Sequence, residues 1–172
     1  MIRKATLQDI DALYALLEPR MRAGTILPRT REEIAANLRD FFLYEREGVI
    51  LGACSLAYGA GQMAEVRSLV VAKPHAGSGI GTALVQACID DALALGYRWI
   101  FALTYVVPLF QKLGFRVIDR SELPEKIWKD CQACFKQANC DETAVIRELV
   151  TVPVSELPQA LTRPGSDPAV SI

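Results

Sequence analysis

The sequence lacks the features that mark membrane, secreted and nucleic-acid-binding proteins. None of its apolar runs approaches the roughly 18 uninterrupted residues that a membrane-spanning helix needs. Residues 1–17 lack the apolar stretch and the small-residue cleavage site of a secretory signal peptide. Lysine and arginine together number 19 against 20 acidic residues, and no basic run stands out. We therefore expect a cytoplasmic protein with no membrane and no nucleic-acid partner.

Cysteine is scarce, with five copies in the chain. In a cytoplasmic protein these are expected to be reduced thiols and not a disulfide framework. Cys54 and Cys88 fall inside apolar patterns and are predicted to be small core residues. Cys131, Cys134 and Cys140 form a cluster that, with a fourth ligand, could hold zinc or an iron–sulfur centre. Because the sequence has no second Cys-x-x-Cys pair and no histidine nearby, we favour reduced structural thiols and expect no metal.

The residues that are present predict one α/β domain over residues 1–150. Apolar residues make up 51% of the 172 residues, which is enough to fill a core. Strand patterns occupy residues 1–5, 40–47, 49–58, 63–71, 98–105, 115–119 and 143–149. Helix patterns occupy residues 7–17, 30–38, 80–95 and 108–113, the second opened by a capping box of Thr30 and Glu33. Prolines, serines and a glycine dominate residues 151–172, so this tail is expected to be loosely held.

A glycine-rich loop separates the strand pattern 63–71 from the helix pattern that starts at Ile80. It carries glycines at positions 77, 79 and 81 in the sequence KPHAGSGIGTAL. The amides of a helix's first turn lack intrahelical partners, and glycine removes the Cβ atoms that would keep a phosphate away from them. The loop therefore predicts a pyrophosphate site made of backbone amides, with a simple tight turn as the alternative. The missing Gly-Lys-Ser/Thr excludes a Walker loop, and the preceding hairpin argues against a dinucleotide fold.

The segments VVAKPHAGSGIGTALV and LFQKLGFRVI, in this order and spacing, resemble the acetyl-CoA motifs of the GNAT superfamily of N-acetyltransferases. The resemblance covers residues 2 to about 118. It implies a GNAT fold, in which a mixed central sheet is splayed at the acetyl-CoA site and carries helices on both faces. It also implies an enzyme with acetyl-CoA as its co-substrate.

In such proteins the strand before the loop pairs with the pantetheine arm through its backbone, and the loop amides hold the pyrophosphate. Carried over to this sequence, the coenzyme-binding residues are Leu69, Val70, Val71, Ala76, Gly77, Ser78, Gly79, Ile80, Gly81, Thr82 and Phe110. The family usually has arginine or glutamine where Ala76 stands, so one side-chain contact to phosphate is expected to be absent.

Glu65 is the predicted base, or the residue that positions a water, for the amine that accepts the acetyl group. It alternates with Arg67 along a strand pattern, so both side chains leave the sheet on one face. Similar family members carry a glutamate at the matching position. The alternative is an ion pair that only solvates the sheet. A backbone amide near Val70 or Val71 is the group expected to polarise the thioester carbonyl.

The departing thiolate also needs a proton. Many GNAT enzymes place a tyrosine where this sequence has Phe110, and phenylalanine has no proton to donate. Tyr105 is the predicted substitute. The alternatives are that Tyr105 is an ordinary aromatic at a strand end, and that the ammonium group of the substrate protonates the thiolate directly.

The stretches TILPRTREEI, RWIFALTYVVPLFQKLGF and SELPEKIWKDC resemble the short amino-acid acetyltransferases related to N-acetylglutamate synthase. With them the resemblance extends up to residue 149. It implies acetyl transfer to the α-amine of L-glutamate, the first step of arginine biosynthesis. The planar fork of arginine suits the carboxylates of such a substrate. Arg29 and Arg31 match the basic loop of that family, and with Arg67 they are the predicted substrate-binding residues. The alternative for Arg31 is a solvated residue in the first turn of a helix.

Two departures from that family keep other functions open. Longer synthases carry an arginine after the Leu-Thr of the 98–105 pattern, where Tyr105 stands here, and an amino-acid-kinase domain that we do not expect in this protein. Glutamine, another small amine or a protein N-terminus are the alternative acceptors. An alternative of another class is a non-catalytic acyl-CoA-binding sensor, suggested by Phe110 and Ala76. A homodimer is kept as a possible assembly.

Overall fold

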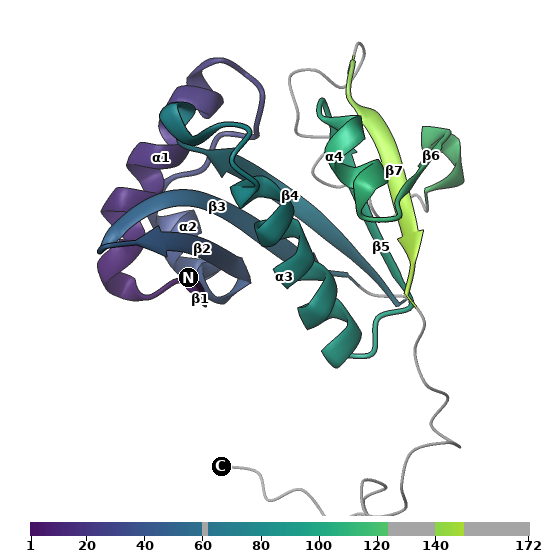
Figure 1. Ribbon diagram of the computed structural model, residues 1–172, viewed down its shortest axis with the longest axis horizontal. Helices are drawn as coiled ribbons and strands as arrows, with labels where there is room; N and C mark the ends of the chain where they lie inside the picture. Colours follow the sequence, from purple (N-terminus) through teal and green to yellow (C-terminus); the bar gives the residue numbers. More distant parts are fainter. Residues whose placement is uncertain (60–61, 124–139, 150–172) are drawn as a thin grey trace, which may run out of the picture.

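The central element is one open, mixed sheet (Figure 1). The computed structural model describes residues 1–59, 62–123 and 140–149. Within these ranges the strands are β1 (Ile2–Lys4), β2 (Phe41–Arg46), β3 (Val49–Tyr58), β4 (Met63–Val71), β5 (Trp99–Thr104), β6 (Arg116–Ile118) and β7 (Thr143–Glu148). Their spatial order is β1-β2-β3-β4-β5-β7-β6; β4 and β5 pair in parallel, and the other described neighbours are antiparallel.

Helices cover both faces of this sheet. On one face α1 (Ile10–Arg22) and α2 (Arg31–Ala36) share a core with β2 and β3, and on the other α3 (Ile80–Ala94) and α4 (Val107–Lys112) do so. The capping box at the start of α2 is present: the Glu33 amide donates to Thr30 Oγ1 at 3.1 Å, and the Thr30 amide donates to Glu33 Oε2 at 2.7 Å. The predicted α/β class, with helices on both faces of a mixed sheet, is therefore confirmed.

Helix α3 lies close against β3 because Gly52 of β3 has no side chain. A Cβ added at Gly52 would lie 2.8 Å from Cγ2 of Ile80 and 3.0 Å from Cδ1 of Leu84. Ile80 is the first residue of α3. This close approach therefore fixes the N-terminal end of α3, and the loop before it, against the sheet.

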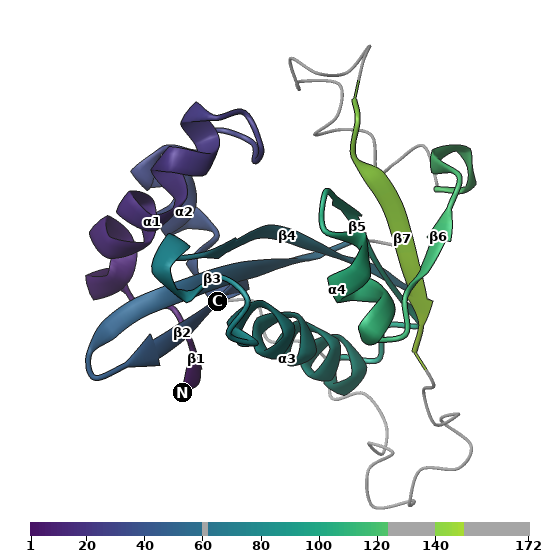
Figure 2. The same cartoon turned by 45° about the horizontal axis from the view of Figure 1, so that its top comes forward.

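Strands β4 and β5 separate toward their C-terminal ends. Their pairing runs from Met63 with Trp99 to Val66 with Ala102. Figures 1 and 2 show the two strands diverging beyond this point, with the α1–α2 connection on one side of the opening and the start of β7 on the other. The splayed sheet that the sequence predicts is thus present.

A β-bulge interrupts β4 at the start of the opening. Ala53 pairs with Val70 and Ser55 with Arg67, so one residue of β3 lies opposite two residues of β4. One of these two is Ser68, whose φ of +52° is uncommon for a residue that carries a side chain. The bulge shifts the alternation of β4 just where the strand leaves its partner β5.

The cysteine predictions have a mixed outcome. Cys54 and Cys88 are fully buried in the core, as predicted, and burial raises the pKa of the Cys54 thiol. Cys131 and Cys134 lie outside the described residues, as does the predicted tail 151–172. In the part of the chain that the structure describes, none of the helices is long and apolar enough to cross a membrane.

Candidate active site

A cavity of about 920 Å³ occupies the opening between β4 and β5. Its walls come from α1, the α1–α2 connection, β4, the loop before α3, the end of β5, α4 and the segments that flank η4 (Arg120–Glu122) and β7. Of the residues predicted from the sequence, it is lined by Arg29, Glu65, Arg67, Leu69, Val70, Val71, Ala76, Gly77, Gly79, Gly81, Thr82, Tyr105 and Phe110. Small-molecule sites typically span roughly 300–1,000 Å³, so the size suits a ligand.

The loop before α3 forms one end of this cavity. Gly79 is the N-cap residue of α3 with a φ of +86°, and a Cβ added there would meet no atom within 4 Å. The amides of Ala76 and Ser78 donate to the carbonyl oxygens of Lys73 and His75, each at 3.3 Å, so these two amides are engaged within the loop. The first-turn amides of α3 point out of its N-terminal end toward the open space. That space fits a phosphate group.

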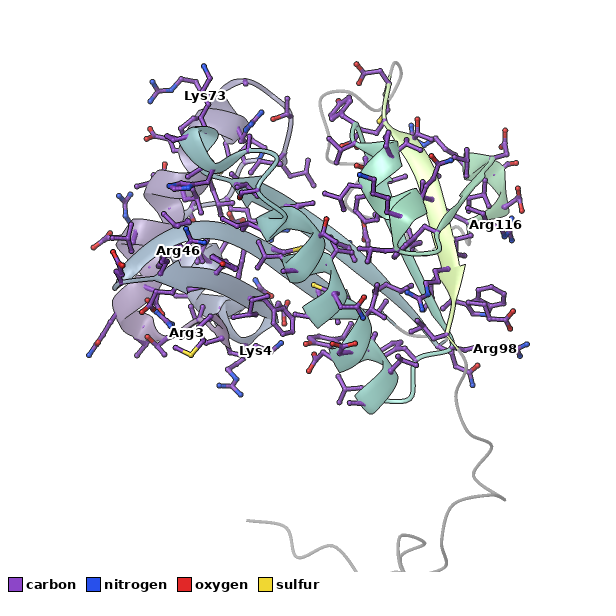
Figure 3. The ribbon with its side chains drawn as sticks, viewed as in Figure 1. Arg3, Lys4, Arg46, Lys73, Arg98 and Arg116 are labelled. Carbon is purple, nitrogen blue, oxygen red and sulfur yellow. The ribbon has the colours of Figure 1, made fainter. Side chains whose placement is uncertain are left out.

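Side chains add little positive charge at this end. His75 lines the cavity, whereas Lys73 is exposed at the outer surface (Figure 3). The Ser78 hydroxyl donates to the His75 carbonyl at 2.6 Å, and the Ile80 side chain is buried in the core. Ser78 and Ile80 therefore stand outside the cavity wall, and Ile80 could reach a ligand only through its amide.

Strand β4 turns backbone groups toward the opening. The Ala72 amide, just after β4, donates to the Leu51 carbonyl at 2.8 Å. Successive amides of a strand point to opposite edges, so the Val71 amide points away from β3 and toward the opening. By the same alternation the Val70 amide points toward β3, and its side chain is buried in the core beneath α1. Of the two amides considered for polarising a carbonyl, Val71 is the one that faces the cavity.

Glu65 and Arg67 lie side by side in the cavity wall. Nε of Arg67 donates to Oε2 of Glu65 at 2.6 Å, and the two side chains are 14% exposed for Glu65 and 25% for Arg67. Arg29 approaches the same region from the α1–α2 connection, where its amide lies 3.1 Å from the sulfur of Met21 in α1. The ion pair holds the Glu65 carboxylate in one position at the cavity wall.

A second, polar cavity of about 210 Å³ lies behind these arginines. Arg29 and Arg67 line both cavities and so form part of the partition between them. Asp40 lines the second cavity, and burial raises the pKa of its carboxyl group, while the charges of Lys4, Arg29 and Arg67 act in the opposite direction. The guanidinium groups of the main cavity thus have a carboxyl group behind them.

Tyr105 and Phe110 belong to the wall opposite β4. Tyr105 is 43% exposed, and its hydroxyl donates to Oδ1 of Asp141 at 2.7 Å. Phe110 is buried and packs edge to face against Phe115, with 5.1 Å between the ring centroids. Phe110 therefore offers an apolar surface to the cavity, and Tyr105 offers a hydroxyl that is already held by a carboxylate.

Arg31 does not line the cavity. It is exposed in the first turn of α2, where its Nε donates to Oδ1 of Asp11 at 2.8 Å. Its guanidinium also lies 3.9 Å from the centroid of the Tyr14 ring. Both contacts hold Arg31 on the surface of α1, so we do not carry it into the functional proposal.

Sequence reasoning missed part of the wall. Arg120, Cys140 and Glu142 line the cavity beyond β5, and Nη1 of Arg120 donates to the Cys140 carbonyl at 3.4 Å. The pairing of Ile118 with Ala144 brings residues 120 and 142 to the same end of the sheet. The register of β6 with β7 identifies them, and the sequence alone does not show this register. The remaining lining residues are Arg20, Thr25, Ile26, Leu27, Val66, Ser68, His75, Leu103, Thr104, Val106, Leu109 and Lys112.

Relatives of known sequence share this domain. The chain matches the model of the Acetyltransferase (GNAT) family over residues 10–115. An uncharacterized N-acetyltransferase of Chlorobaculum tepidum is 34% identical over 148 residues, which cover 86% of this chain and 96% of that protein. The amino-acid acetyltransferase of Pasteurella multocida is 33% identical over 127 residues, which cover 73% of this chain and 29% of that protein.

Solved structures share the fold. The N-acetylglutamate synthase of Neisseria gonorrhoeae, complexed with coenzyme A and N-acetyl-glutamate, has a TM-score of 0.79 at 29% identity and covers 87% of this chain. The match spans 35% of the synthase, so this chain corresponds to about a third of that protein. A Mycobacterium tuberculosis protein in complex with coenzyme A has a TM-score of 0.75 at 20% identity, which shows the fold alone. Because the family model matches more than half of its residues, the chain belongs to the GNAT family of acetyltransferases.

Proposed function

We propose that this protein transfers the acetyl group of acetyl-CoA to the α-amine of L-glutamate, giving N-acetylglutamate for arginine biosynthesis. The observation that carries the proposal is that one cavity contains both the glycine loop and the arginines Arg29 and Arg67. The loop suits a pyrophosphate, and the arginines suit a carboxylate. The amino-acid acetyltransferase of P. multocida and the synthase of N. gonorrhoeae support this choice of acceptor.

The coenzyme would lie along β4 and the loop before α3. We assign the pantetheine arm to the backbone of Leu69 and Val71, whose side of β4 faces the opening. We assign the pyrophosphate to the amides of Gly77 and of residues 79–82, because those of Ala76 and Ser78 already donate within the loop. Bound acetyl-CoA supplies a thioester whose carbonyl carbon an amine can attack.

Glu65 would prepare the acceptor for that attack. An ammonium group has no lone pair, so the α-amine must first lose a proton. The Glu65 carboxylate, held in place by Arg67, accepts this proton directly or through a water. A backbone amide of β4 that faces the opening donates to the thioester carbonyl oxygen, where negative charge develops as the carbon–nitrogen bond forms.

Tyr105 is our proposed proton donor to the departing thiolate. Its hydroxyl lies in the cavity wall and would exchange its bond to Asp141 for one to the sulfur. Phe110 at the position of the usual tyrosine cannot do this. In the alternative route the proton comes from the acceptor's own ammonium group, and Tyr105 then has no role in catalysis.

The test is thiol release from acetyl-CoA with a panel of acceptors. Glutamate should support turnover best, with glutamine, other small amino acids and a peptide N-terminus as comparisons. A preference for one of these others replaces glutamate as the acceptor. Binding of acetyl-CoA without thiol release from any acceptor identifies an acyl-CoA-binding sensor and rejects the enzymatic proposal.

Several wider assignments belong to the same proposal. We propose one catalytic domain over residues 1–150 that acts in the cytoplasm, followed by a loosely held tail over 151–172. We propose that Cys131, Cys134 and Cys140 bind no metal, which metal analysis of protein purified without chelator tests. Sedimentation of the purified protein tests whether it forms a homodimer.

A further inference from the structure

Arg120 lies in the cavity wall on the far side of the opening from Arg29 and Arg67. It is the first residue of η4, directly after β6, and this turn is capped by the carboxylate of Asp119. Its side chain is half-buried, and its bond to the Cys140 carbonyl holds the guanidinium near the start of β7. The strand order places β6 two strands beyond β5, roughly 10 Å from it at the usual strand spacing. Arg120 nevertheless lines the cavity, because its side chain extends toward Cys140, just before β7, which lies between β6 and β5.

The charges at the acceptor end of the cavity favour a substrate with two negative charges. This end is the part formed by α1, the α1–α2 connection, β4 and the segments around η4 and β7. Its charged lining residues are Arg20, Arg29, Arg67 and Arg120, which are positive, and Glu65 and Glu142, which are negative. The described part of the wall therefore carries a net charge of +2 there. The two carboxylates of a dicarboxylic amino acid, with a combined charge of −2, complement this positive charge.

We propose that Arg120 binds the side-chain carboxylate of the acceptor, while Arg29 and Arg67 bind its α-carboxylate. This inference rests on the proposed function. The α-amine must lie next to Glu65 to lose its proton, and the α-carboxylate is attached to the same carbon as the amine. The α-carboxylate is therefore beside Arg67, the ion-pair partner of Glu65. The acceptor's side chain then extends across the opening, toward the wall that contains Arg120.

This arrangement makes Arg120 the residue that distinguishes glutamate from glutamine. A guanidinium binds a carboxylate through two parallel, charge-assisted hydrogen bonds. The side-chain amide of glutamine is neutral, and its NH₂ group would face the N–H donors of Arg120. Removal of the positive charge should therefore lower kcat/KM for glutamate far more than kcat/KM for glutamine.

The decisive experiment measures kcat/KM for glutamate and for glutamine in wild-type protein and in Arg120→Gln. In the variant, kcat/KM for glutamate should fall about 10- to 100-fold, the equivalent of one or two charge-assisted hydrogen bonds. With glutamine it should change less than about threefold, so the ratio of the two values shifts at least about threefold. Arg116→Gln is the matched control, because Arg116 is exposed on β6 and lies on the outer surface away from the opening (Figure 3). It should leave both values unchanged.

Two further measurements keep the result interpretable. Arg120→Lys keeps the positive charge but lacks the paired N–H donors of the guanidinium. Its kcat/KM for glutamate should lie between the values of wild type and Arg120→Gln. The Kd of acetyl-CoA should stay unchanged in all variants, which shows that they are folded. If Arg120→Gln lowers kcat/KM equally for both acceptors, or for neither, the proposed role of Arg120 is overturned. A wild-type protein that acetylates neither acceptor overturns the proposed function itself, so the two failures are distinguishable.

Discussion

Comparing Gly79→Ala with Gly96→Ala separates two roles of Gly79: adopting a left-handed backbone conformation, and leaving space for the pyrophosphate of acetyl-CoA. Gly79 and Gly96 lie at the two ends of α3 with φ values of +86° and +81°, and an added Cβ would meet no atom within 4 Å at either position. An L-residue in this left-handed conformation costs about 1–2 kcal/mol. For a domain of this size, each variant should therefore lower the Tm of the ligand-free protein by about 2–8 °C.

The two variants should differ in their affinity for acetyl-CoA. Gly79 lines the cavity, whereas Gly96 follows the other end of the helix. The Cβ of alanine at position 79 would occupy the open space in front of the first-turn amides. Loss of one charge-assisted hydrogen bond to the pyrophosphate, worth about 1.5–3 kcal/mol, raises the Kd about 10- to 150-fold. Gly96→Ala should bind as tightly as wild type.

Isothermal titration with acetyl-CoA, together with calorimetric melting of the ligand-free proteins, measures both effects. Equal Kd values for the two variants, with both melting lower than wild type, would refute the assignment of the pyrophosphate to this loop. A drop in Tm for one variant alone would refute the estimate of equal backbone cost. Gly96→Ala thus controls for any general loss of stability.

Three further outcomes follow from the contacts described above. Glu65→Gln should lower kcat about 10²- to 10⁴-fold while the Kd of acetyl-CoA stays the same, and an unchanged kcat removes Glu65 from the mechanism. Arg29→Ala should raise the KM for glutamate roughly tenfold with a smaller effect on kcat, and an unaffected KM excludes a carboxylate contact. Hydrogen bonds from Arg3 at 2.7 and 2.8 Å hold the pKa of Asp9 well below its usual value. A carboxylate with a lowered folded-state pKa stabilises the fold above its unfolded pKa, so the Tm deficit of Asp9→Asn should be full near neutral pH and shrink below about pH 4. A deficit that is constant down to about pH 2 contradicts this.

Local chemistry explains why the sequence predicts most of the elements. The capping box of Thr30 and Glu33 starts α2 at the expected residue, and Ile80 begins α3 directly after the glycine loop. Gly96 lies just beyond the end of α3, with the positive φ that such a position favours. Each signal depends on residues within a few positions of one another, so a single sequence contains all the information. The coenzyme end of the site is predictable for the same reason, since it is one strand, one loop and one helix.

The acceptor end depends on contacts between distant residues, and the sequence does not show these. The pairing of Ile118 with Ala144 decides that Arg120 reaches the cavity. The contact of Arg31 with Asp11 decides that Arg31 stays on the surface. The bulge at Ser68 depends on how β4 pairs with β3. Strand register and helix docking are set by the packing of the whole domain, so residue type and spacing could not reveal them.

The position of β7 has a consequence for how the protein is made. β5 and β6 are close in sequence, but the described part of the sheet places β7 between them, and both pair with it. On the ribosome, the outer edge of β5 therefore waits for residues 143–148 to leave the exit tunnel. Until then the nascent chain presents an unpaired strand edge, the kind of surface that invites chaperones or aggregation. Among the described strands, the wall that contains Tyr105 and Arg120 is thus completed only after β7 has been synthesised.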